Sequence, residues 1–100
     1  MARLWGILRR KQRIWQDTVV ESEGMDASAA QEALNDLCYK LDIPRPIWLD
    51  KNTDEIERFG RTAFAADSFI ESIAFDRLEI EFLREKSRSS DPRNDFGPML

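Results

Sequence analysis

Apolar residues recur at two different spacings in this chain, and the two spacings call for a helix and a strand that pack together. Between residues 28 and 41 they follow three- and four-residue steps, which places them along one side of a helix. This stripe consists of Ala30, Ala33, Leu34, Leu37, Cys38 and Leu41. Ser28 is followed by Gln31 at the third position, a capping-box pattern, so we expect Ser28 to cap the helix.

The second spacing is a strict alternation over residues 77–83. Apolar side chains fall on one face and charged side chains on the other, namely Leu78, Ile80 and Phe82 against Arg77, Glu79 and Glu81. A period of two with β-branched and aromatic residues predicts a strand with one buried face.

Residues 2–23 allow two interpretations. Apolar runs over residues 4–8 and 14–20 flank a polar segment and contain strand-favouring residues, which indicates a β-hairpin. The turn between them lacks the Asn-Gly or Asp-Gly typical of tight hairpins. The alternative is a basic amphipathic helix over residues 3–16, although Lys11 would interrupt its apolar stripe. We favour the hairpin.

Two prolines keep residues 43–49 extended, because each fixes its own φ and restricts the residue before it. We expect this connector to be anchored by its apolar side chains, which are Ile43, Ile47, Trp48 and Leu49. Asn52 is then expected to cap a short helix over residues 53–59, with Ile56 and Phe59 facing inward and Gly60 ending it.

The remaining residues complete the predicted organisation. A short strand or extended segment is expected near residues 62–64, and Asp67 is expected to open one helical turn. From Glu85 onward the chain is polar and poor in apolar residues, which predicts a disordered tail. We therefore expect one domain over residues 1–85 and a disordered C-terminal tail over residues 86–100.

Composition limits the possible chemistry. The 100 residues include one cysteine and no histidine. An intrachain disulfide is therefore impossible, and zinc sites built from four Cys or from Cys and His pairs are excluded. The apolar stretch at the N-terminus is too short for a signal peptide. The sequence contains no run of about 18 apolar residues, so no membrane-spanning helix is predicted. We expect a small, soluble, acidic protein of the cytoplasm.

Charge is distributed unevenly along the chain. The formal net charge is −4, yet the first fifteen residues carry five positive charges and no acid, which leaves −9 on the other eighty-five. Such asymmetry attracts nucleic acid, anionic lipid or an acidic partner, and it is also neutralised readily by acids of the same chain.

Three runs of sequence resemble a group of short, uncharacterised bacterial proteins. They are residues 38–49 (CYKLDIPRPIWL), residues 59–62 (FGRT) and residues 75–81 (FDRLEIE). The resemblance covers residues 2–83 and implies a compact α+β domain from a bacterium. It implies no activity, so no functional residue is transferred from it.

The basic segment is the first candidate site. We predict that Arg9, Arg10, Lys11 and Arg13 bind an anion or a partner, with Arg61 as a further contact. Cations neutralise phosphates and nearby tryptophans stack on bases, which would suit nucleic acid. The alternative is a solvated turn whose arginines pair with acids of the strand at 77–83, while Trp5 and Trp15 pack in the core. The acidic composition argues against nucleic acid.

Other candidates have simpler structural explanations. The carboxylates at Asp54, Glu55 and Glu57 suit the start of a helix, and Cys38 suits the apolar stripe. No catalytic residue, metal site or cofactor is predicted, because no motif for nucleotide binding or nucleophilic catalysis is present.

The patterns together predict an α+β domain. A small antiparallel sheet, made from the N-terminal hairpin and the strand at 77–83, packs on one main helix, and a second short helix closes the edge. The predicted core is Trp5, Ile7, Leu34, Leu37, Leu41, Trp48, Phe59, Phe69, Leu78, Ile80 and Phe82. The favoured function is a binding or regulatory protein that acts through a protein partner or through self-association. The alternatives are binding of nucleic acid or another anionic surface through the basic segment, and an enzyme without histidine.

Overall fold

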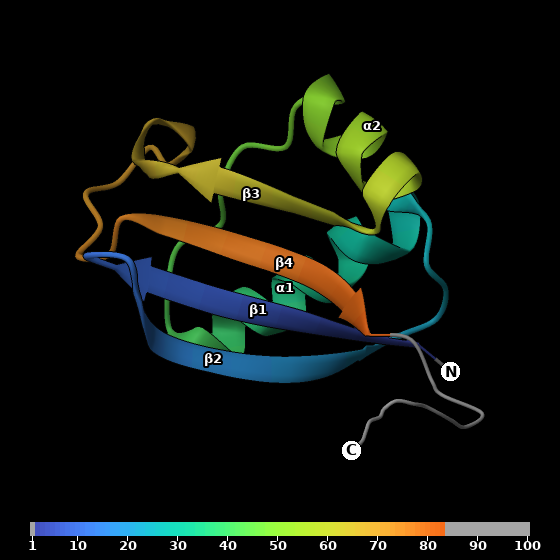
Figure 1. Cartoon of the computed structure of the whole chain (residues 1–100), viewed down its shortest axis with the longest axis horizontal. Helices are drawn as coiled ribbons and strands as arrows, with labels where there is room; N and C mark the ends of the chain where they lie inside the picture. The colour runs from blue at the N-terminus through green and yellow to red at the C-terminus, as the bar shows by residue number, and fades with distance from the viewer. Residues whose placement is uncertain (1, 84–100) are drawn as a thin grey trace, which may run out of the picture.

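A computed structural model describes residues 2–83 of the chain, and Figure 1 shows their arrangement. They form a four-stranded antiparallel sheet and two α-helices, which confirms the predicted α+β fold. The strand order is β2-β1-β4-β3. In chain order the elements are β1 (Ala2–Arg10), β2 (Arg13–Ser22), α1 (Ala27–Leu41), α2 (Asp50–Phe59), β3 (Arg61–Ala65), the 3₁₀ turn η1 (Ala66–Ser68) and β4 (Arg77–Leu83).

The N-terminal segment is a hairpin and not a helix. β1 and β2 pair antiparallel from Ala2 opposite Ser22 to Arg10 opposite Arg13. The register shifts between Leu8 and Arg9, so that β2 carries one extra residue, Trp15. Such a bulge re-aims side chains beside it.

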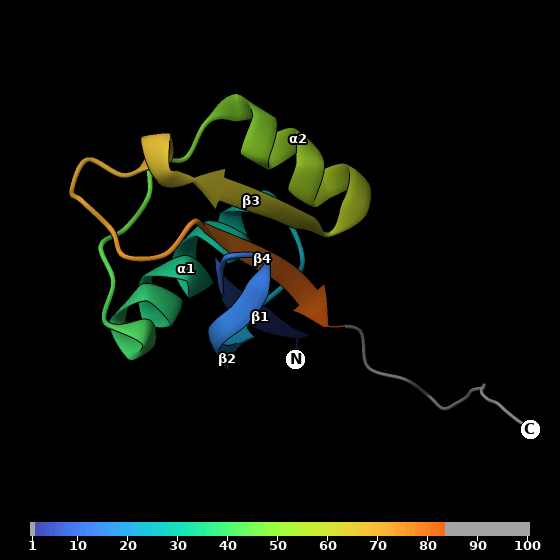
Figure 2. The same ribbon diagram turned by 60° about the vertical axis from the view of Figure 1, so that its left-hand side comes forward.

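Helix α1 covers one face of the sheet, and the opposite face has no helix over it (Figures 1 and 2). The apolar stripe predicted on this helix is buried in full. It packs against alternate residues of the strands, so the core lies between α1 and the sheet. Strand residues in this core include Leu4, Leu8, Val20, Phe64, Leu78, Ile80 and Phe82.

Gly6 allows α1 to approach the sheet closely. A Cβ atom built on Gly6 would lie 2.2 Å from Cδ2 of Leu37, and Leu37 is fully buried on α1. Leu37 therefore rests on the backbone of β1, the strand that lies between β2 and β4, and α1 also contacts β2.

Both predicted helix caps are wrong by a few residues. Asp26, and not Ser28, caps α1, because its Oδ1 accepts from the backbone N–H of Ala29 at 2.9 Å. Helix α2 begins at Asp50, so Asn52 lies inside its first turn. From there the Asn52 side chain reaches back to the Leu49 N–H at 2.9 Å.

Gly60 ends α2 as predicted, with a positive φ of 72° and its N–H donating to the carbonyl of Ile56. Phe59 is the error in the predicted core, since its side chain is 62% exposed. It lies in the last turn of α2, where the helix meets the start of β3, and it lines a groove on the sheet surface. Trp5 and Trp48 are only partly buried.

The open face of the sheet, opposite α1, carries the alternate residues of β1, which are Arg3, Trp5, Ile7 and Arg9. Ile7 is buried, but it lies outside the main hydrophobic core cluster. The prediction that Ile7 is buried is correct, although its side chain belongs to this second face.

The connector over residues 43–49 has no helix or strand, and two of its four predicted anchors, Ile43 and Trp48, pack against the core. Pro46 is buried, whereas Ile47 and Leu49 are exposed. The Ile47 N–H donates to the carbonyl of Ser68 at 2.8 Å. The centroids of the Trp48 and Phe64 rings lie 5.7 Å apart, so the predicted anchor at Trp48 is confirmed.

The strand predicted near residues 62–64 is β3, and the helical turn near Asp67 is η1, which begins one residue earlier at Ala66. The predicted tail over residues 86–100 lies outside the described residues. Neither α-helix within residues 2–83 has the length and apolar content to cross a membrane.

The Gly6 contact generates a first prediction. Gly6→Ala should lower the free energy of unfolding by about 1–3 kcal/mol, because the added methyl displaces the buried Leu37 side chain. Gly24→Ala is the matched control, since its Cβ would meet only Ala29 at 3.7 Å, and it should stay within about 0.5 kcal/mol of the wild type. Urea unfolding measures both, and equal midpoints for the two variants would contradict the close contact.

Candidate functional site

Three of the predicted cations gather where β1 turns into β2. Arg10 and Arg13 face each other as the last pair of the hairpin, and Lys11 lies in the turn between them. All three side chains are exposed. Together with Ile14 and Trp15 they line a shallow surface depression, and we call these five residues the hairpin end.

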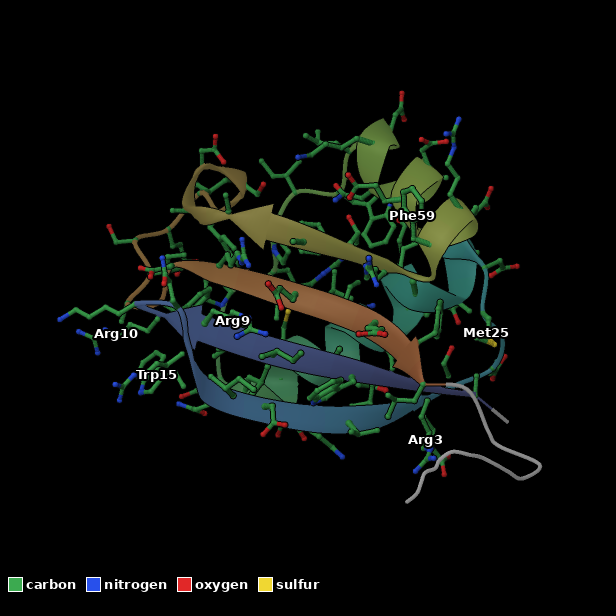
Figure 3. The ribbon with its side chains drawn as sticks, viewed as in Figure 1. Arg3, Arg9, Arg10, Trp15, Met25 and Phe59 are labelled. Atoms are coloured by element: carbon green, nitrogen blue, oxygen red, sulfur yellow. The ribbon has the colours of Figure 1, made fainter. Side chains whose placement is uncertain are left out.

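An exposed tryptophan accompanies the cations at the hairpin end. The guanidinium carbon of Arg10 lies 5.4 Å from the centre of the Trp15 ring, within the range of a cation–π interaction (Figure 3). Trp15 is 42% exposed and Ile14 is 51% exposed. The expectation that Trp15 packs in the core is therefore wrong, because the bulge places it at the rim of the sheet.

The turn of the hairpin end has a strained backbone. Lys11 and Gln12 have φ angles of 54° and 67°, which is the left-handed region that residues other than glycine rarely adopt. The carboxylate of Asp76 accepts from the Lys11 N–H at 2.6 Å, and the Asp76 N–H donates to the carbonyl of Arg9 at 2.7 Å. These two bonds hold the turn against the segment that enters β4.

Arg9 is separated from the other cations by the alternation of β1. Its side chain lies on the open face, and its Nε binds Glu79 at 2.9 Å. Arg77, opposite Arg9 in the sheet, binds the same carboxylate at 2.6 Å. Glu79 thus lies between two arginines and reduces the repulsion between them. The predicted pairing with an acid of the last strand is correct for Arg9.

Arg61 is not part of the hairpin end. It begins β3 opposite Glu81, and the cation cluster lies near Arg77, at the other end of β4. Arg61, Phe59 and Glu55 line a groove of about 340 Å³ between α2 and the open face. The five predicted binding residues therefore fall in three places.

A second groove adjoins the hairpin end on the α1 side of the sheet, and we call it the Trp15 groove. Its volume is about 490 Å³. Its apolar lining comes from four separate segments and includes Leu8, Trp15, Leu41, Ile43, Pro44, Ile73 and Phe75. The charged residues that line the Trp15 groove are Lys40 and Asp42, at the C-terminal end of α1.

Sequence reasoning missed Ile14 and Lys40 as parts of this surface. Ile14 belongs to an apolar run, which suggested burial, and no local signal marks the bulge that follows it. Lys40 is 25 residues from Trp15 in the chain, so only the packing of α1 against the sheet brings the two to one groove.

The other candidate ligands and acids are explained by the fold. Within the described part of the chain, no group of three or more Cys, Asp or Glu side chains is placed to hold a metal ion. Glu55 accepts a hydrogen bond of 2.5 Å from the Thr62 hydroxyl, which in turn accepts from the buried amide of Asn52 at 2.8 Å. This network joins α2 to β3.

Cys38 is buried on α1. Burial raises the pKa of its thiol to about 11, although the positive charge of Arg45 acts in the opposite direction. Since the thiolate is the reactive form, the thiol is inert near neutral pH.

The strained turn generates a second prediction. Gln12→Gly should raise the free energy of unfolding by about 0.5–1 kcal/mol, because glycine adopts a positive φ without steric cost and none of the cations is lost. Gly60→Ala should have the opposite effect of similar size, since φ is 72° there and no atom lies within 4 Å of the new Cβ. Urea unfolding compares them. A Gln12→Gly variant less stable than the wild type would show that the turn is not strained.

Cys38 generates a third prediction. Iodoacetamide at about pH 8 should leave the folded chain unmodified, because the thiol stays protonated and covered. The same treatment in concentrated urea should alkylate it, which serves as the control. Mass spectrometry counts the adducts, and rapid modification of the folded chain would contradict the burial of Cys38.

Comparisons with known proteins identify no relative of this chain. No protein-family model matches it. Searches of curated proteins and of solved structures likewise find no match. The resemblance to short bacterial proteins therefore stays a prediction, and the argument for function rests on the geometry of residues 2–83.

Proposed function

We propose that this chain is a small binding protein that acts through a protein partner and that the hairpin end is its contact surface. The observation that carries the proposal is the exposed ring of Trp15 among three exposed cations. Tryptophan and arginine are the residues that most often dominate the energy of protein interfaces. Exposed apolar groups with a charged rim are typical of such contacts.

The strained turn supports this proposal. Left-handed backbone at two successive residues costs stability, and such strain tends to cluster at functional sites. An Asn-Gly turn would be more stable here. The observed Lys-Gln turn instead adds a cation to the exposed cluster.

A second candidate function uses the same residues. Arg10, Lys11 and Arg13 can neutralise phosphates while Trp15 stacks on a base, as in proteins that bind single-stranded nucleic acid. The −9 charge carried by the rest of the chain opposes a long polyanion, so we place this candidate second. We also propose the cytoplasm as the compartment, supported by a single cysteine that cannot form an intrachain disulfide.

Charge reversal at the hairpin end tests the proposed function. The variant Arg10→Glu/Lys11→Glu/Arg13→Glu should lose partners that the wild type captures from a lysate of the source organism, by about tenfold or more in quantitative mass spectrometry. The control is Arg3→Glu/Lys51→Glu/Arg61→Glu, which changes the net charge equally at exposed sites elsewhere and should keep those partners.

Two further measurements complete this test. Light scattering of the wild type shows whether the partner is a second copy of the chain. Capture of the same proteins by all three chains would contradict a role for the hairpin end. Loss of a nucleic acid, rather than a protein, from the charge-reversed variant would favour the second candidate.

A further inference from the structure

The two edge strands of the sheet, β3 and β2, differ in length and in what lies beside them. β3 has five residues, and α2 packs beside it, with the Asn52 amide donating to the carbonyl of Ala63 at 3.4 Å. β2 has ten residues, and within residues 2–83 no strand pairs with its outer side. An edge of this length presents a row of unpaired N–H and C=O groups, which is a template for another strand.

Apolar and cationic contacts flank the same stretch of β2. Trp15 and Gln16 belong to β2 and also line the Trp15 groove, so a strand added along this edge would have a side-chain pocket beside it. Arg10 and Arg13 stand at the hairpin end, and Lys40 stands at the groove. The acids close to them are Asp17 on β2 itself, Asp42 and Asp76. The Asp17 carboxylate already accepts from the Trp5 indole N–H, and that of Asp76 from the Lys11 N–H.

Charge complementarity identifies the occupant. Cations outnumber acids around the first half of β2, so a segment rich in Asp and Glu is attracted there and a basic segment is repelled. Alternate residues of a strand point to opposite sides, which lets one set enter the groove while the other remains in water. The groove accepts an apolar side chain where Leu8, Trp15 and Phe75 line it.

We propose that β2 accepts an extended acidic segment of a partner protein as a fifth strand of the sheet. One apolar side chain of the segment enters the Trp15 groove, and its carboxylates contact Arg10, Lys11 and Arg13. Main-chain hydrogen bonds supply affinity in this mode, and the groove and the cations supply specificity. This inference rests on the proposed function and names the chemistry of the partner.

A designed peptide tests the inference directly. The probe is acetyl-Glu-Val-Glu-Phe-Glu-Val-Glu-amide, titrated into the isotope-labelled full chain and followed by amide chemical shifts. We expect saturable shifts below about 1 mM peptide, confined to residues of β2 and of the Trp15 groove. Raising the salt from about 0.05 M to about 0.3 M should weaken binding several-fold, because exposed charges are screened.

Variants separate the two contributions. Arg10→Glu/Lys11→Glu/Arg13→Glu should lower the affinity about tenfold, and Trp15→Ala should do the same through loss of the groove wall. The control Arg3→Glu/Lys51→Glu/Arg61→Glu should bind as the wild type does. A peptide with lysine in place of every glutamate should not bind.

Methylation of the peptide backbone distinguishes strand addition from simple docking. Alternate residues of a strand direct their N–H groups to the same neighbour. Of two peptides N-methylated at odd or at even positions, one should therefore lose binding and the other should keep it. Equal behaviour of the two peptides overturns strand addition.

The remaining outcomes also decide the inference. No shifts at about 1 mM peptide, or shifts confined to the open face or to the α2 groove, overturn it, while the lysate experiment still tests the proposed function separately. Tighter binding of a ten-nucleotide oligothymidine at the same residues overturns it in favour of nucleic acid. Dimerisation through β2, seen as a doubled mass in light scattering and lost on adding peptide, would make a second copy the occupant instead.

Discussion

The contact between Gly6 and Leu37 determines how the helix and the sheet fit together. A buried leucine reaches the backbone of β1 at a residue with no side chain, so α1 lies close against the sheet. Interiors are packed densely, and the buried side chains of this helix join those of the strands in one hydrophobic cluster. The apolar faces of β1 and β4 are thus buried on one side of the sheet. The opposite face carries both charged and apolar residues, and among them Ile7 is buried.

One-sided packing makes the edges of the sheet important. On the β3 side, α2 and the Asn52–Thr62–Glu55 network occupy the edge and bind polar groups there. On the β2 side, α1 contributes to the core beneath the strand, but no described element extends the sheet. β2 is also the longest strand, so the least protected edge is the most extended one. Its charged residues and its bulge are features that limit unspecific pairing. An open edge with these features favours a selected partner over aggregation.

The helix, the hairpin and the strand at 77–83 were predictable because each has a regular spacing of apolar residues. Leu78, Ile80 and Phe82 fixed the buried face of β4, and the stripe from Ala30 to Leu41 fixed that of α1. The cap of α1 was displaced because Asp26 and Ser28 are both good capping residues, and the helix begins at Ala27, which is buried. Phe59 shares the helical face of Ile56 and looked equally internal. Its exposure depends on where α2 ends relative to the sheet, which no local pattern records.

The candidate site was predictable only in part, for a related reason. Sequence places Arg9, Arg10, Lys11 and Arg13 together, but strand alternation turns Arg9 to the open face, where Glu79 binds it. Arg61 is remote because β3 enters the sheet at the opposite end. The Trp15 groove draws its lining from four distant segments, so it exists only after folding.

Folding also concentrates three positive charges of the N-terminal segment at one place on the surface. Of the five positive charges in the first fifteen residues, Arg3 lies at the opposite end of β1 from the turn, and Arg9 is bound by Glu79 on the open face (Figure 3). The three cations that remain are concentrated at the hairpin end of an otherwise acidic chain. A field of this shape orients an approaching acidic segment toward the turn before contact is made. β2 and the Trp15 groove adjoin the turn. The cations that attract the acidic segment therefore also bring it next to the unpaired edge of β2.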